Sequence, residues 1–261
     1  MSTRAREYAA TVLRREPLSP HLVRLVLGGA GLSGFESTGV PDEWVGLVVP
    51  GQFQSRYYTV RSWTGIELTL DVVVHDHGLV TEWVSRGCVG ETVRITEPRG
   101  SFAMPADASW LMLVGDLTAL PAMARIAQTA HAGGCDDVRI WAEVRDDLTG
   151  YLPAELDVTW LTPPQPDDSA LATTVAEIEW PAGDGYFWMA GESGQMRAIR
   201  KHLMRDRRLP AAAYDVMGYW RGGALRQPRA VDPAPIWRAG RAAGKTDEQI
   251  WADYDAAGDR R

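Results

Sequence analysis

The sequence predicts an antiparallel β-barrel followed by an α/β domain with a parallel sheet, and a short helix near the C-terminal end. Up to about residue 106, many short strand candidates are separated by Gly, Pro and Ser, which is typical of a small barrel. After that point, apolar strands alternate with helical segments, the pattern of βαβ units. We therefore expect a barrel domain over residues 1–106, an α/β domain over 107–226, and a linker with a helix over 227–261.

The composition indicates an ordinary globular protein. The chain has 261 residues, 45% of them hydrophobic and 23% charged, enough for two ordinary domains. The formal net charge of −7 argues against general binding of nucleic acid, which needs clustered cations. No apolar run approaches the about 20 residues of a membrane span, and the N-terminal residues have no signal-peptide pattern. We expect a cytoplasmic protein, with neither nucleic acid nor membrane as a partner, and a monomer.

No metal site is expected. Cys88 and Cys135 are far apart in the sequence and show no CxxC spacing, so neither a disulfide framework nor a thiolate site is indicated. His75 and His77 are the closest pair of candidate ligands. Two histidines alone do not supply the three or four protein ligands that a metal site usually needs.

The predicted barrel is built from short strands. The candidates cover residues 9–13, 22–27, 46–49, 55–61, 68–75 and 91–95. The glycine-rich segment 28–31 resembles a dinucleotide-binding loop superficially. No amphipathic helix follows it, so we interpret it as a loop between strands.

The strand at residues 55–61 carries side chains suited to a ligand. The guanidinium groups of Arg56 and Arg61 can bind phosphate oxygens, the ring of Tyr58 can stack on a flat heterocycle, and the hydroxyl of Thr59 can hydrogen-bond a ring atom. Taken alone, an exposed strand with incidental arginines explains the segment equally well.

A helix start follows the next strand. Residues 78–84 have helix-start character, and Thr81 is suited to capping or to donating a hydroxyl. The free N–H groups of a helix start, close to two arginines, would attract an anion. A short helix that packs against the end of the barrel is an equally good interpretation.

The second half of the chain alternates strands and helices. Strands are predicted at residues 110–114, 138–144, 158–161, 186–190 and 214–219, and helices at 122–132, 169–179 and 195–205. In parallel sheets, ligands bind outside the carboxyl ends of the strands. We therefore expect a ligand near Gly115-Asp116 and near Gly191-Glu192.

The helix at residues 195–205 is two-sided. Its apolar stripe is Met196, Ile199 and Leu203. The charged positions are Arg197, Arg200, Lys201 and Arg205. They form either a solvated face or a docking patch for an anionic substrate or a nucleotide phosphate.

A last helix is predicted beyond residue 245. Thr246-Asp247-Glu248-Gln249 has the spacing of a capping box, and Ile250, Trp251 and Tyr254 supply a short apolar stripe. We expect this helix to pack on the protein as an ordered cap.

Several short motifs occur in a specific order. They are Arg56-x-Tyr58-Thr59-x-Arg61, Asp71-Val72-Val73-Val74-His75, Pro98-Arg99-Gly100, residues 115–122 (GDLTALPA), residues 188–192 (WMAGE) and Gly218-Tyr219-Trp220-Arg221. Between about residues 8 and 223 the chain resembles the siderophore-interacting proteins, flavin-dependent ferric-siderophore reductases of the ferredoxin-reductase-like superfamily. Each motif is weak evidence by itself, but together they are specific.

The resemblance implies a bound FAD. It implies cofactor contacts from Arg56, Tyr58, Thr59, Arg61, Asp71, Val73, His75, Gly78 and Thr81. Similar proteins often have Gly-Pro-Ala-Ser where this chain has Gly78-Leu79-Val80-Thr81. The missing proline loosens the turn but keeps its backbone donors.

The resemblance also implies a donor and a substrate. Gly115, Asp116, Thr118, Ala119, Gly191 and Glu192 match positions that border a nicotinamide nucleotide. NADPH or NADH would be the donor, and ferredoxin is an alternative. A ferric siderophore would be the substrate, with Arg197, Arg200, Lys201 and Arg205 as candidates for attracting it. No catalytic acid, base or nucleophile is expected beyond the flavin.

Two other functions fit the same residues. A general NAD(P)H:flavin or ferredoxin-type reductase would use the same fold on another acceptor, and the Gly218–Arg221 ending disfavours it. A flavin-free siderophore-binding protein would lack the absorption of a flavin.

Overall fold

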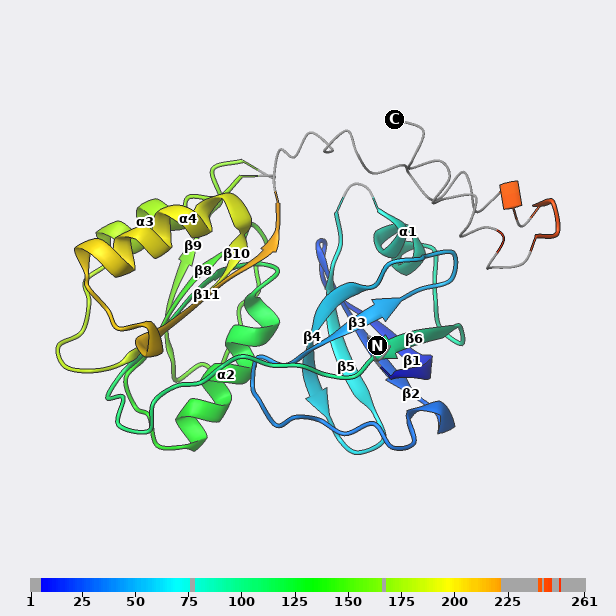
Figure 1. Ribbon diagram of the computed structural model, residues 1–261, viewed down its shortest axis with the longest axis horizontal. Helices are drawn as coiled ribbons and strands as arrows, with labels where there is room; N and C mark the ends of the chain where they lie inside the picture. Colours follow the sequence, from blue (N-terminus) through cyan, green and yellow to red (C-terminus); the bar gives the residue numbers. More distant parts are fainter. Residues whose placement is uncertain are drawn as a thin grey trace.

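Six strands close into an antiparallel barrel (Figure 1). The computed structural model describes residues 6–75, 78–165, 168–221, 239–240, 242–245 and 249. The strands are β1 (Glu7–Ser19), β2 (Leu22–Gly28), β3 (Trp44–Val48), β4 (Arg56–Trp63), β5 (Leu68–Val73) and β6 (Thr92–Thr96), joined in the order β1-β2-β5-β4-β3-β6. The predicted barrel is confirmed.

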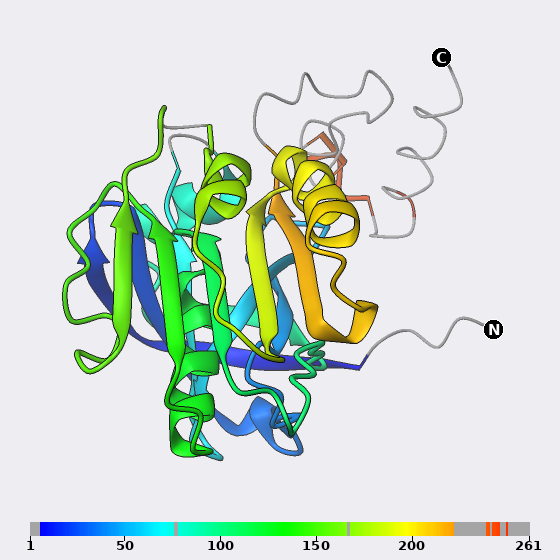
Figure 2. The same cartoon turned by 90° about the vertical axis from the view of Figure 1, so that its left-hand side faces the viewer.

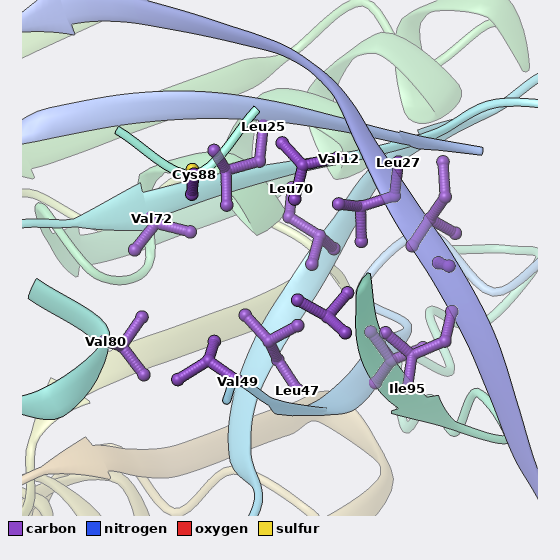
Figure 3. Close-up of a cluster of buried hydrophobic side chains, with 14 of the residues drawn as sticks. Val12, Leu25, Leu27, Leu47, Val49, Leu70, Val72, Val80, Cys88 and Ile95 are labelled. Atoms are coloured by element: carbon purple, nitrogen blue, oxygen red, sulfur yellow. The ribbon is translucent and has the colours of Figure 1, made fainter. Parts of the chain in front are cut away.

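The barrel is filled by alternate residues of its strands. Val12, Leu25, Leu70 and Ile95 are at most 1% exposed and point into one apolar cluster (Figure 3). This alternation is the reason that short strands with period-two hydrophobicity suffice to build a closed core. A short 3-10 helix, η1 (Ala30–Leu32), follows β2.

Helix α1 (Leu79–Ser85) packs against the barrel core. Val80 and Trp83 belong to the same apolar cluster as the strands, and Trp83 is 1% exposed. The Trp83 indole donates a hydrogen bond of 2.9 Å to Glu91. The helix expected after residue 78 is therefore present, and its buried face fixes where the N-terminal turn of the helix lies.

The second half of the chain forms a five-stranded parallel sheet. Its strands are β7 (Leu111–Asp116), β8 (Val138–Glu143), β9 (Asp157–Leu161), β10 (Tyr186–Glu192) and β11 (Tyr214–Trp220), in the order β11-β10-β7-β8-β9. All four neighbouring strand pairs within it are parallel, and the arrows point the same way in Figure 2. The predicted parallel α/β architecture is confirmed.

Helices cover both faces of this sheet. Helix α2 (Leu120–Ala132) packs on one face, in an apolar cluster that also contains Leu22 of the barrel. Helices α3 (Leu171–Glu177) and α4 (Ser193–Lys201) pack on the other face. Figure 1 shows α2 between the sheet and the barrel, with α3 and α4 on the far side.

Two irregular helices follow α4. A π-helical turn, η2 (His202–Asp206), continues it, and a 3-10 turn, η3 (Ala211–Ala213), precedes β11. The predicted helix at residues 195–205 therefore begins two residues earlier and changes its winding at His202.

Two expectations stay predictions. The boundary near residue 106 falls within the segment between β6 and β7. Thr246, Asp247 and Glu248 of the capping box and the apolar residues Ile250, Trp251 and Tyr254 lie outside the described residues. Within the described part of the chain, no helix is long and apolar enough to cross a bilayer.

A buried ion pair joins α2 to the barrel. Arg125 donates hydrogen bonds of 2.8 Å to the Glu43 carboxylate and to the backbone carbonyl of Val60 in β4. The Glu43 side chain is fully buried. Burial alone would raise the pKa of Glu43, but hydrogen bonds from Ser37, Thr38 and Arg125 outweigh it and hold that pKa below its ordinary value.

Replacing Arg125 by Met is expected to lower the free energy of unfolding by about 3–5 kcal/mol, because it leaves the Glu43 carboxylate buried without its cation. Chemical denaturation at neutral pH measures the change. The control is Arg139→Met, which breaks the half-exposed pair with Asp137 and should cost less than about 1 kcal/mol. Equal losses in the two variants would show that the Arg125–Glu43 pair does not hold the barrel and sheet together.

Candidate functional site

The first half of β4 places two candidate side chains on one face of the strand. Arg56 lies opposite Leu47, and Tyr58 lies opposite Val45. Both partners are core residues of the barrel, so Arg56 and Tyr58 continue the inward face of β4 at one end of the barrel. Arg56 is exposed there, and Tyr58 is half-buried. Burial raises the pKa of Tyr58 to about 12, although the Arg56 cation opposes the shift.

The same part of β4 has one open edge. From Arg56 to Thr59 the strand pairs with β3, whereas its pairing with β5 runs only from Val60 to Trp63. Among the described residues, the edge of β4 toward β5 is therefore unpaired over its first half. Backbone groups at such an edge are available to a ligand.

The turn before α1 lies just beyond the end of β5. Gly78 occupies the N-cap position with a φ of 137°, a conformation that disfavours any residue with a Cβ. The Thr81 hydroxyl accepts a hydrogen bond of 3.2 Å from the backbone N–H of His75. This hydrogen bond ties α1 to His75, so Thr81 does not act as the cap of the helix.

Thr59 points away from Arg56 and Tyr58, toward the sheet. Its side chain is 5% exposed, and the hydroxyl of Tyr219 from β11 lies beside it. The Tyr219 hydroxyl is buried and makes no hydrogen bond of good geometry with the described residues. Burial raises the pKa of Tyr219, and the neighbouring Thr59 offsets part of that effect.

The carboxyl end of β7 carries a buried carboxylate. Asp116 is 6% exposed and accepts hydrogen bonds from the Thr118 N–H (2.9 Å), the Thr118 hydroxyl (2.6 Å) and the Trp220 indole (2.6 Å). Burial raises the pKa of Asp116, and these hydrogen bonds limit the rise. We call Thr59, Asp116, Tyr219 and Trp220 the junction, because they bring β4, β7 and β11 together.

The end of β10 packs closely on the junction. A Cβ at Gly191 would lie 2.6 Å from the Asp116 carboxylate, and one at Gly115 would lie 2.5 Å from Ala119. Glycine is therefore needed at both positions so that the strands and the turn before α2 can approach one another. Glu192 accepts a hydrogen bond of 3.0 Å from the Gln195 N–H and caps α4. The residues expected around a donor nucleotide are thus gathered at one edge of the sheet.

Arg61 and Asp71 lie in a separate groove between barrel and sheet. Arg24 donates two hydrogen bonds of 2.8 Å to Asp71, and the Tyr151 hydroxyl donates to the same carboxylate. Arg61 donates to Gln128 of α2 (3.0 Å) and lies 5.8 Å from the Tyr151 ring centre. Arg24, Arg61, Gln128 and Tyr151 line a cavity of about 750 Å³, and Asp71 is buried behind Arg24 and Tyr151. The structure does not bring Arg61 and Asp71 to Arg56, with which the sequence grouped them.

Val73 ends β5 and packs against the apolar cluster under α2. The Val73 side chain therefore stabilises the contact between the barrel and the sheet. Only the Val73 backbone is available at the open edge beside β4.

The basic residues of α4 are also apart from the junction. The buried side of α4, formed by Met196, Ile199 and Leu203, packs on the sheet face opposite α2 and the barrel. Arg197, Arg200, Lys201 and Arg205 are exposed on the outer side. Arg200 donates to the backbone carbonyl of Val216. The structure does not place these cations beside β4.

Sequence reasoning missed two residues of the junction as site residues. Tyr219 and Trp220 entered only through the ending Gly218–Arg221. Two aromatic residues at the end of the last strand of a parallel sheet could have signalled the site, since the strand ends border the ligand.

Two family models match the chain. The siderophore-interacting FAD-binding domain matches residues 51–102, and the siderophore-interacting protein model matches residues 108–223. The chain belongs to the siderophore-interacting protein family. Its barrel and parallel sheet have the ferredoxin-reductase-like fold.

Individual proteins of the family are similar over most of their length. The NADPH-dependent ferric-chelate reductase of Escherichia coli is 29% identical over 254 residues, covering 88% of this chain and 92% of that one. The ferric vibriobactin reductase ViuB of Vibrio cholerae is 25% identical, over 81% and 88% of the two chains. A siderophore utilization protein from T. fusca superposes with a TM-score of 0.71 at 26% identity, covering 85% and 95%.

The variant Trp220→Phe tests the junction. It removes the indole N–H from a buried carboxylate, which is expected to lower the free energy of unfolding by about 1–3 kcal/mol at neutral pH. Because the folded-state pKa of Asp116 is raised, the deficit should shrink as the pH falls and the carboxyl takes up a proton. Chemical denaturation at neutral and acidic pH measures it.

The matched control is Trp160→Phe, which alters an indole that is 41% exposed on β9. A deficit in Trp220→Phe no larger than in this control, or one that grows on acidification, would show that the Trp220–Asp116 contact contributes nothing.

Proposed function

We propose that this protein reduces ferric siderophores to the ferrous form, taking electrons from NADPH or NADH through bound FAD. The observation that carries the proposal is the junction, where the strand with the flavin motif meets the carboxyl edge of the sheet at Thr59 and Tyr219. Relatives named as ferric-chelate and ferric vibriobactin reductases support the substrate class. The protein would act as a monomer in the cytoplasm, with ferredoxin as an alternative donor.

The residues at the end of the barrel fit FAD. Arg56 is exposed and has no carboxylate partner among the described residues, as a guanidinium meant for phosphate oxygens requires. The Tyr58 ring and the open edge of β4 lie on the same half-strand, and the Gly78 turn would add backbone donors beyond the end of β5. The Tyr219 hydroxyl, which is buried beside Thr59 and makes no hydrogen bond of good geometry with the described residues, adds a polar group where the flavin edge would meet the sheet. FAD, when bound, accepts a hydride and can release its two electrons singly.

The edge of the sheet would hold the donor. Asp116 fixes the start of α2 by accepting both hydrogen bonds of Thr118. The glycines at positions 115 and 191 let β7, β10 and the α2 turn pack closely at this edge. Residues 1–106 would then be the flavin domain and residues 107–226 the donor domain.

Reduction releases the iron because Fe(II) is a lower-charge ion that hard oxygen ligands hold less tightly. One nicotinamide cofactor supplies two electrons, so two ferric chelates are reduced for each donor oxidised. No side chain needs to act as acid, base or nucleophile for this electron transfer. The residues of the site would therefore bind the flavin and the donor and orient them for electron transfer.

Arg56→Ala is expected to weaken FAD binding about tenfold or more, because a charge-assisted contact to phosphate is worth about 1.5–3 kcal/mol. Fluorescence titration of the flavin-stripped protein with FAD measures the affinity. Arg197→Ala, an exposed arginine on the far face of the sheet, is the control and should leave the affinity unchanged. Equal affinities in wild type and Arg56→Ala would remove Arg56 from the cofactor site.

The flavin-loaded protein is expected to reduce ferric siderophores in anaerobic assays that trap Fe(II). The protein is first mixed with one of the donors, and ferric hydroxamate, catecholate and carboxylate chelates are then added to the reduced protein. If the reduced protein reoxidises with quinones or dyes but with none of these chelates, the general-reductase alternative is correct. If it carries no flavin and binds chelates without reducing them, the carrier alternative is correct.

A further inference from the structure

The segment from Arg197 to Arg208 concentrates positive charge. It holds six basic residues, Arg197, Arg200, Lys201, Arg205, Arg207 and Arg208, and a single acidic one, Asp206. All six are exposed. Asp206 pairs with His202 at 3.0 Å. Within the described part of the chain, none of the six forms an ion pair with a carboxylate. We call these six residues and Met204 the cationic face.

The helical repeat gathers four of these residues on one side. Met196, Ile199 and Leu203 point into the core, so Arg197, Lys201, Met204 and Arg205 recur on the opposite side. Arg200 and Arg207 turn to Val216 and Trp180 at the margins of this row, and Arg208, with a φ of 56°, follows the end of the helical segment. The π-helical turn η2 continues α4 without a break and extends the row. Met204, in the middle of the row, is 60% exposed. Figures 1 and 2 show α4 along the outside of the molecule, on the side of the sheet away from the barrel.

The cationic face does not belong to the junction. Helix α4 starts at the carboxyl edge of the sheet, where the Ser193 hydroxyl donates to the Trp220 carbonyl (2.6 Å). From there, each successive helical residue lies about 1.5 Å further along the helix axis, away from the junction. The face therefore has no direct part in binding a chelate beside β4.

Keeping these cations together is unfavourable for the isolated protein. Like charges at helical spacing repel one another, and within the described residues only Arg200 has a carboxylate, that of Asp215, near enough to interact with it. Arg200 donates to a backbone carbonyl, and Arg207 lies 4.8 Å from the centre of the Trp180 ring. The whole chain has a formal net charge of −7, so the rest of the molecule is more acidic than that total.

We propose that the cationic face docks the protein on an anionic lipid surface. A protein partner would require an interface core that is depleted of charge and largely apolar, whereas this face offers one apolar side chain among six cations. A bilayer of anionic lipids attracts a row of cations through its diffuse surface potential, without matched pockets. The exposed Met204 side chain can enter the headgroup region beside them.

Docking by this face sets one orientation. The acidic remainder of the molecule is repelled by the same surface, so the barrel and the junction stay on the side away from the lipid. This peripheral contact departs from the expectation of no membrane partner that the composition favoured. It rests on the cationic face alone and does not depend on the proposed reductase activity.

Vesicle co-sedimentation of the full-length protein tests the proposal. The protein should bind vesicles of phosphatidylcholine with about 30% phosphatidylglycerol at low ionic strength and be released at high salt. It should not bind vesicles of phosphatidylcholine alone. The variant Arg197→Gln/Lys201→Gln/Arg205→Gln should lower the partition coefficient about a hundredfold, at about fivefold for each cation removed.

The matched control is Arg14→Gln/Arg86→Gln/Arg94→Gln, which removes the same charge from exposed positions on the barrel side. Its partition coefficient should change less than about threefold, because those cations lie far from the docked face. Circular dichroism and melting curves establish that both variants are folded.

Three results would overturn the proposal. The wild-type protein could remain in the supernatant with anionic vesicles at low salt. The barrel variant could lose as much binding as the variant of the cationic face. The wild-type protein could bind an acidic iron–sulfur ferredoxin but no vesicles, and the variant of the cationic face could lose the ferredoxin binding. That result would assign the face to a protein partner.

Discussion

The architecture depends on how β4 is shared between two neighbours. Its inward side completes the barrel core through Val60, and its outward side is covered by α2 and β11. Arg125 fixes this arrangement by binding both the buried Glu43 carboxylate and the Val60 carbonyl. Because Arg125 of α2 binds two groups of the barrel, and Thr59 of β4 lies beside Tyr219 of β11, the flavin motif faces the strand ends of the sheet.

Buried carboxylates recur where the two halves meet. Glu43, Asp71 and Asp116 are at most 6% exposed, and each accepts hydrogen bonds from two or more donors. A buried charge is tolerated only when its donors are in place. Arg125 and Tyr151 donate across the contact to Glu43 and Asp71 of the barrel, so a displaced barrel would remove one donor from each of these two carboxylates. Asp116 is held within its own half by Thr118 and Trp220. Asp71 belongs to this group by its contacts with Arg24 and Tyr151.

Exposed positive charge is found at two separate places on the molecule. Arg56 is exposed at the end of the barrel, while the cationic face follows α4 on the opposite side of the sheet. Helix α4 contacts the junction at its first residue, through Ser193 and Trp220. The sequence grouped its cations with the substrate because a charge count carries no information about which face of a sheet a helix covers.

The sequence by itself determined the local structure and the family. Period-two hydrophobicity predicted the barrel strands, alternation of strands and helices predicted the parallel sheet, and ordered motifs predicted the family, because each depends on neighbours in the chain. Tertiary structure decided which side chains meet. Arg61 is five residues from Arg56 but turns to Gln128 and Tyr151, and Trp220 reaches Asp116 across 104 residues. Such contacts follow from strand order and from the sheet face that each helix covers, which a single sequence does not encode in its spacing.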